Sequence, residues 1–279
     1  LPSIQRDLGI GLSELEWTVN AYALTFAVLM LTGGKLADFF GRRRIFLIGL
    51  VTFTISSLAC GLAASGGTLI GARTLQGIGA ALMLPATLSI ISATFPAHQR
   101  GMAIGIWAGV SAMALAIGPL IGGLITEHIN WSWIFFVNVP IGVLGLIVGR
   151  LVIKESRDTS AEQRLDFPGL LASAIGLFAL TFALIEANSY GWTDPMIIGL
   201  FVLSAVSLAA FVLLELHQRS PMLDLSLFRS STFAAANVVA LLVTLAMFGV
   251  FFFMSIYMQN ILGYSATKTG AAFLPMTIL

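Results

Sequence analysis

Apolar runs of about twenty residues alternate with short polar segments along the whole chain. A helix of that length crosses the roughly 30 Å of hydrocarbon in a bilayer, whereas the strands of a membrane β-barrel are shorter and alternate apolar with polar positions. We therefore expect an all-α, polytopic membrane protein with about eight complete transmembrane helices and the start of a ninth. The expected complete spans cover residues 17–34, 45–64, 68–93, 101–126, 134–149, 167–185, 195–214 and 232–261, and the next begins near residue 269.

The basic residues of the polar segments are unevenly distributed. Eleven of the 14 Lys and Arg residues fall on one side of the membrane under this threading, two fall on the other, and Arg73 lies within a span. Short connecting loops rich in Lys and Arg stay in the cytoplasm. We therefore expect the loops with Arg42–Arg44 and Arg150–Arg164 to be cytoplasmic, in a multi-pass protein of the inner (plasma) membrane.

Composition narrows the classes of function. Charged residues make up 10% of the chain, against about 25% in soluble domains, and the net charge of +1 gives no basis for a nucleic-acid partner. Cys60 is the single cysteine, which excludes an internal disulfide and a cysteine metal cluster. The chain begins at Leu1 and Pro2 and stops within an apolar run, so we expect a fragment with both ends missing.

The residue types that carry catalysis do not form a recognisable set. The sequence has no Ser/His/Asp arrangement, no cluster of metal ligands and no Walker motif for binding nucleotide phosphates. We expect no enzyme, no metal and no cofactor, and we expect any active transport to draw on an ion gradient. A channel or a non-transporting membrane scaffold is the alternative from a different class.

Several stretches resemble one family. The segments GGKLADFFGRRR (33–44), LIGARTLQGIGAALMLP (69–85) and GVSAMALAIGPLIGG (109–123) resemble the motifs of the second-to-third, fourth and fifth helices of major facilitator superfamily transporters. Two more, WSWIFFVNVPIG (131–142) and PMLDLSLFRSSTF (221–233), are similar to segments of the fourteen-span drug:proton antiporters of the EmrB/QacA type. The resemblance covers essentially the whole chain.

This resemblance implies a domain organisation. Residues 1–150 would be the N-terminal helical bundle with transmembrane helices 2–6, and 151–166 a cytoplasmic linker. Residues 167–216 would be the inserted helix pair (7–8), and 217–279 the start of the C-terminal bundle with helix 9 and part of helix 10. The first helix, which is expected to carry an acidic coupling site in this branch, would then be absent.

The resemblance also implies a function. It is proton-coupled antiport, in which small hydrophobic or cationic drugs leave the cell by alternating access. The partners would be the small-molecule substrate, protons and membrane lipid; the protein would be a monomer, and the proton gradient would take the place of a cofactor. A related exporter of metabolites such as amino acids or siderophores is the alternative within this class.

The segment 33–44 is interpreted as a tight, charged turn between two spans. Asp38 and Arg42 are four residues apart, so they share a side if the turn is helical, and Gly34 and Gly41 permit close backbone approach. The resemblance makes these four residues a cytoplasmic conformational latch. The alternative is a topological turn with solvated charges, which would contribute little energy.

Arg73 is the only charge well inside a span, and Gln76 lies one turn further on the same face. A mid-membrane arginine costs at least about 2.5 kcal/mol to insert, so it normally faces the interior of a bundle. The resemblance gives Arg73 and Gln76 a part in proton coupling. The alternative is that Arg73 extends its side chain to the outer interface.

The fifth-helix motif contains Gly109, Gly118, Pro119, Gly122 and Gly123. Pro119 should kink the helix, and glycines four residues apart allow another helix to approach closely. The resemblance makes this motif a sealed seam between the two halves of an antiporter, and ordinary helix packing is the alternative.

Candidate substrate contacts are less specific. Aromatic and amide groups suit amphipathic or cationic compounds, and packing within helices explains each of them equally well. The candidates are Asn20, Tyr22, Phe26, Tyr257 and Gln259. We expect Glu127, Glu186 and Asp194, at the outer ends of spans, to be solvated acids.

Overall fold

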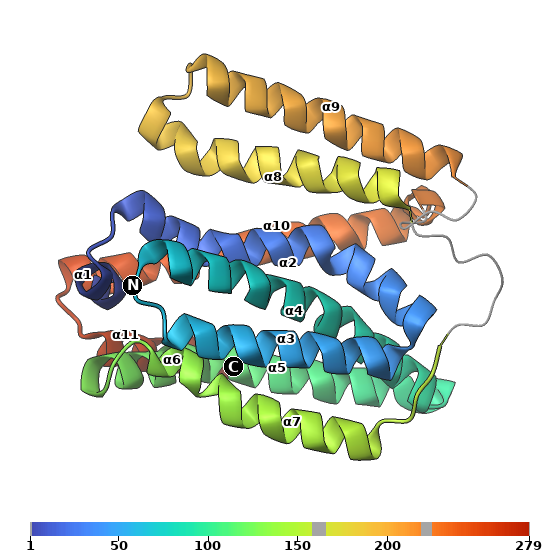
Figure 1. Ribbon diagram of the computed structural model, residues 1–279, viewed down its shortest axis with the longest axis horizontal. Helices are drawn as coiled ribbons and strands as arrows, with labels where there is room; N and C mark the ends of the chain where they lie inside the picture. Colours follow the sequence, from blue (N-terminus) through green and yellow to red (C-terminus); the bar gives the residue numbers. More distant parts are fainter. Residues whose placement is uncertain (1, 158–165, 219–224, 279) are drawn as a thin grey trace. The chain divides into compact units, whose positions relative to one another are not determined.

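The computed structural model describes residues 2–157, 166–218 and 225–278, and these residues form helices joined by short connections, without a strand (Figure 1). The first seven elements are α1 (Pro2–Leu8), α2 (Leu12–Phe40), α3 (Arg42–Gly61), α4 (Gly66–Thr94), α5 (Ala97–His128), α6 (Trp133–Phe136) and α7 (Asn138–Val152). They are followed by α8 (Phe167–Tyr190), α9 (Pro195–His217), the 3-10 helix η1 (Leu225–Arg229), α10 (Ser231–Ile256), the π-helix η2 (Tyr257–Ile261) and α11 (Ala266–Ile278).

The expected all-α polytopic membrane fold is confirmed. Among the described residues, seven helical segments are long and apolar enough to cross a membrane: Ser13–Phe40, Arg42–Gly61, Gly66–Thr94, Trp133–Val152, Phe167–Tyr190, Pro195–His217 and Ser231–Phe251. The predicted span 101–126 lies within α5, which is 32 residues long.

Several predicted boundaries are wrong. The segment 33–44 is not a turn, because α2 stays helical to Phe40 and α3 begins at Arg42. The connection expected between the spans 68–93 and 101–126 consists of Phe95 and Pro96 alone, since α4 ends at Thr94 and α5 begins at Ala97. Backbone hydrogen bonding continues a helix past the end of its apolar run, so hydropathy alone underestimates helix length.

The chain forms two compact units, the first made of residues 1–100 with 135–223 and the second of 101–134 with 224–279. In the first unit α4 packs against both α2 and α3, α7 packs against α3, and α8 packs against α9 and α2. Glycines permit the closest approaches: a Cβ at Gly79 of α4 would lie 2.5 Å from the backbone nitrogen of Phe53 in α3. Glycine is therefore required at this helix contact.

The helices α8 and α9 form an antiparallel pair within the first unit (Figure 1). Asp166 caps α8 by accepting from the backbone N–H of Gly169 at 2.7 Å, and Asp194 caps α9 by accepting from Met196 at 2.8 Å. Each aspartate is followed within two residues by a proline, a usual start for a helix. The side-chain amide of Gln218, just past α9, donates to Asp166 at 2.6 Å and closes the pair at that end.

The second unit holds most of α5 together with η1, α10, η2 and α11. The end of α5 contacts the start of α11 through Glu127, which accepts from the hydroxyl of Thr267 at 2.7 Å and from its backbone N–H at 3.4 Å. These bonds hold the pKa of the exposed Glu127 carboxyl below its usual range. Glu127 is therefore more than the freely solvated acid that the sequence suggested.

Candidate functional site

A single residue joins α2 to α3. Gly41 has φ +111°, a conformation that residues with a side chain rarely adopt, and its N–H still donates to Ala37 O at 3.1 Å. Two long helices therefore meet at a one-residue corner. Gly41 is required there for its backbone conformation.

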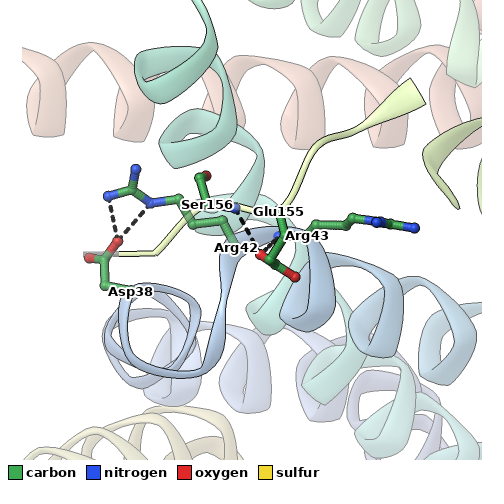
Figure 2. Close-up of polar contacts among 5 residues, drawn as sticks. All are labelled: Asp38, Arg42, Arg43, Glu155 and Ser156. Carbon is green, nitrogen blue, oxygen red and sulfur yellow. Dashed lines mark hydrogen bonds and ion pairs between the residues drawn. The ribbon is translucent and has the colours of Figure 1, made fainter. Parts of the chain in front are cut away.

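Asp38 and Arg42 pair across this corner. The Nε and Nη2 atoms of Arg42 each lie 2.9 Å from Oδ1 of Asp38, and the two side chains are 20% and 34% exposed for Arg42 and Asp38 respectively (Figure 2). The predicted placement of the two residues on the same side is thus observed. A partly exposed pair of this kind stabilises a fold by about 1 kcal/mol or less. The pair therefore fixes the positions of the two side chains more than it stabilises the fold.

The segment that follows α7 caps the start of α3 (Figure 2). Ser156 O accepts from the N–H of Arg42 at 2.8 Å, and the two carboxylate oxygens of Glu155 accept from the N–H groups of Arg43 and Arg44 at 3.1 Å each. The Nη2 of Arg43 also donates to Arg150 O at 2.7 Å. All three N–H groups at the beginning of α3 thus have acceptors, and a carboxylate faces the positive end of the helix.

Sequence reasoning did not identify Glu155. One signal was available: the first turn of α3 contains three arginines and no acidic or capping side chain, so its N–H groups needed an acceptor from elsewhere. Nothing in the sequence indicated which of the acids in the linker would supply it.

A groove of about 320 Å³ runs beside the corner between α2 and α4. Its lining includes Gly34, Lys35, Asp38 and Pro85. A Cβ at Gly34 would lie 3.6 Å from Cβ of Pro85, an ordinary contact distance. Gly34 therefore keeps the groove wide without being sterically indispensable.

Arg73 points into the first unit. Its Nε donates to Thr18 O at 2.9 Å, its Nη1 donates to Oε1 of Gln76 at 2.7 Å, and its guanidinium lies 4.3 Å from the ring centroid of Tyr22. These partners come from α2 and α4, so the charge is held between two helices by a carbonyl, an amide and an aromatic face. This geometry differs from that of an arginine extended toward an interface.

The network continues from Gln76 to α3 and α7. The amide nitrogens of Gln76 and Asn138 donate to Oγ of Ser57 at 2.9 and 3.0 Å, and Ser57 donates to Phe135 O at 3.0 Å. Gln76 and Ser57 are buried, so each bond satisfies a group that water does not reach. The sequence grouped Arg73 with Gln76 but did not predict Ser57 or Thr18.

The candidate substrate residues fall into both units. The rings of Tyr22 and Phe26 stack on α2 with their centroids 6.2 Å apart, and the guanidinium of Arg73 lies over the ring of Tyr22. Asn20 is half-buried on the same helix. Tyr257 and Gln259 lie in η2 of the second unit. A role for these five residues in substrate contact stays a prediction.

The fifth-helix motif lies on α5, which is continuous from Ala97 to His128 and passes through Pro119 and Gly123. A Cβ built at Gly109, Gly118 or Gly122 would meet no atom of another described residue within 4 Å. Within the second unit these glycines touch no other described helix, and the role of the motif as a seam stays a prediction.

Glu186 differs from the sequence-based expectation of a solvated acid. Its side chain is 7% exposed, and its Oε1 accepts from Nε1 of Trp17 at 2.9 Å and from Oγ of Ser13 at 3.1 Å. It is buried because α8 packs against α2, a contact that no local pattern in the sequence indicates.

In the described ranges no three His, Cys, Asp or Glu residues come together as a cluster of ligands. The polar groups that do converge include the corner at Gly41, the network around Arg73 and the contact of Glu186 with Trp17 and Ser13, and each of them connects helices.

The family model described as "Major Facilitator Superfamily" matches residues 1–279. The chain belongs to the major facilitator superfamily. This membership confirms the resemblance seen in the motifs, while the EmrB/QacA branch stays a prediction.

Several curated members of this superfamily are similar to the chain over 99% of its length. The tetracenomycin C resistance and export protein of Streptomyces glaucescens is 37% identical over 276 residues, and the puromycin resistance protein pur8 of Streptomyces alboniger is 42% identical over 277. The methylenomycin A resistance protein of Bacillus subtilis is 36% identical over 277. The aligned regions make up 51%, 55% and 59% of these relatives, so the chain spans about half of their length.

Proposed function

We propose that this chain is part of a secondary transporter that exports small hydrophobic or cationic drugs across the inner (plasma) membrane in exchange for protons. The observation that carries the proposal is the match, over 99% of this chain, to superfamily members whose names refer to resistance to or export of different antibiotics. Transport would be driven by the proton gradient, without a cofactor and without enzymatic chemistry, in a protein that acts as a monomer.

The geometry supports alternating access as the mechanism. In this proposal the corner of Gly41, Asp38 and Arg42, together with Gly34, is a latch at the cytoplasmic end of the first unit. Its contacts change as the two halves of the whole protein rock. Arg73 and Gln76 take part in proton coupling. Their network reaches α2, α3 and the segment before α7. A change of charge near Arg73 would therefore alter hydrogen bonds that connect several helices.

The test is substrate transport by the full-length protein in proteoliposomes. An imposed pH gradient is expected to drive uptake of a cationic dye against its concentration gradient, and an uncoupler should abolish this accumulation. Saturation with rising dye concentration separates a transporter from a channel. Dye movement at the same rate with and without the pH gradient or the uncoupler would disprove proton-coupled exchange.

The same vesicles distinguish drug export from metabolite export. A panel of hydrophobic cations, neutral drugs, amino acids and siderophores is offered at equal concentration. The proposal requires gradient-driven uptake of the drugs, and uptake confined to amino acids or siderophores would replace it with the alternative.

A further inference from the structure

An apolar groove of about 620 Å³ lies between α2, α4, α8 and α9 within the first unit. Its volume is in the range of small-molecule sites, roughly 300–1,000 Å³. The lining is mostly aliphatic and aromatic and includes Leu24, Val28, Ile70, Ile175, Phe178 and Leu203. All four helices belong to the segments that are apolar enough to cross a membrane, so a ligand would enter from hydrocarbon.

A buried carboxylate lies beside this groove. Trp17 lines the groove and also donates its indole N–H to Glu186, whose other hydrogen-bond donor is the hydroxyl of Ser13. Both donors are neutral, and within the described residues no Lys, Arg or His forms an ion pair with Glu186. A carboxylate removed from water is normally paired with a cation, so the site lacks the positive charge that would complete it.

Aromatic rings connect the carboxylate to the groove. Phe178, Phe182 and Glu186 follow at intervals of four residues along α8 and therefore share one face of the helix. The ring of Phe182 lies 5.5 Å from that of Trp17 and 5.9 Å from that of Phe178. Aromatic faces next to a carboxylate attract organic cations through both the ring quadrupole and the charge.

We propose that Glu186 and this groove form a binding site for lipophilic organic cations. The positive charge lies against Glu186 and Trp17, and the apolar body fills the space between the helix pair α8–α9 and helices α2 and α4. Arg73, Gln76 and Asp38 do not line the groove, so this site is separate from the network and the latch. The inference concerns binding and stands whether or not the protein exports such compounds.

Photolabelling of the full-length protein in nanodiscs tests the proposal without any ion gradient. The probe is an aryl-azide derivative of tetraphenylphosphonium, and its neutral counterpart is the same azide on triphenylphosphine oxide. Labelled positions are mapped by mass spectrometry. We expect the cation to label peptides from α2 or α8 that contain groove residues, and E186Q to lower this labelling by about tenfold at subsaturating concentration.

Three variants separate charge from packing. E186Q retains an oxygen acceptor for Trp17, so labelling by the neutral probe should be unchanged, while E186D restores the charge and should recover most of the labelling by the cation. A174F narrows the groove and should lower labelling by both probes, because Ala174 is part of the lining. E16Q is the matched control, since it removes an exposed acid next to Trp17 and should have no effect.

Each contrary result would overturn the inference. Absence of labelling along the groove in the wild type would mean that lipid fills it or that it is closed. Unchanged labelling of E186Q by the cation would exclude a role for the charge. An equal loss of labelling by both probes in E186Q would show that Glu186 serves only to hold α8 against α2. Dye transport in vesicles is a separate measurement, so failure of this site and failure of the export proposal can be told apart.

Discussion

The carboxylate of Glu155 occupies the space beside Gly41 that a side chain would need. A Cβ built at Gly41 would lie 2.7 Å from Oε1 of Glu155, the same atom that accepts from the N–H of Arg43. Glycine at the corner and the acid after α7 are therefore matched to each other, although 114 positions separate them in the chain.

This match predicts coupling between the two residues. G41A should destabilise the full-length protein by about 1–3 kcal/mol, because alanine is strained at φ +111° and also collides with Glu155. In an E155A background the collision is absent, so the same substitution should cost less. Thermal unfolding of the four proteins of this cycle measures the difference. Strict additivity of the two substitutions would contradict it.

The latch predicts a loss of transport without a loss of insertion. D38N removes the charge that Arg42 binds, and transport in proteoliposomes should fall by about tenfold or more, equivalent to about 1.4 kcal/mol in the rate-limiting step. The amount of protein in the membrane should be unchanged, since the pair contributes little stability. D194N is a useful comparison because it removes an acid from a helix cap outside the corner. Wild-type rates in D38N would leave the pair as a solvated surface contact.

The network around Arg73 predicts an effect on stability. Q76L removes one hydrogen bond from Ser57 and one from Arg73, and the free energy of unfolding should fall by about 0.5–1.5 kcal/mol for each bond lost. T74V on the same helix is the control, because Thr74 bonds only to Ile70 O one turn earlier. Equal unfolding temperatures for Q76L and T74V would show that the network does not stabilise the fold.

The contact between Glu127 and Thr267 predicts a dependence on pH. Thr267 lowers the pKa of Glu127 in the folded state, so this contribution to stability is present above the ordinary glutamate pKa of about 4.3 and is lost as pH falls through the lower folded value. T267V should reduce the unfolding temperature at pH 7, and the difference from wild type should shrink below pH 4. A difference that stays constant with pH would assign the effect to packing.

The glycine motif on α5 predicts that function is more sensitive than folding. Within its unit, a side chain at position 118 meets no other described helix, so in G118L insertion and unfolding temperature should change little while transport is blocked. G101L on the same helix likewise meets no other described helix within its unit but lies outside the motif, and it should transport normally. Equal activity of the two variants would remove the special role of Gly118.

The fold could be predicted because a membrane-spanning helix can be recognised from one continuous stretch of sequence. Twenty apolar residues between polar segments indicate a helix whatever the rest of the chain does, and the superfamily motifs in α2 to α5 are local as well. The helix ends were less predictable. Lys35 and Asp38 are polar, but their backbone groups continue the hydrogen bonding of α2 to the corner.

The missed residues share a different property. Glu155, Ser57 and Glu186 each bind a partner more than a dozen residues away in the chain, and the choice of partner follows from which helices pack together. A pattern of apolar positions fixes that a helix exists but leaves its neighbours undetermined. The sequence alone therefore predicts a solvated Glu186, whereas the packing of α8 on α2 buries it.

The single-residue connection between α2 and α3 also restricts how these helices can move. Because Gly41 is the only linking residue, the angle between their axes is set largely by one pair of backbone torsions. Any tilt of one helix must rotate those torsions or carry its neighbour along as a rigid body. A change in the angle between α2 and α3 therefore has to act through the torsions of Gly41 and also disturb the packing of both helices on α4.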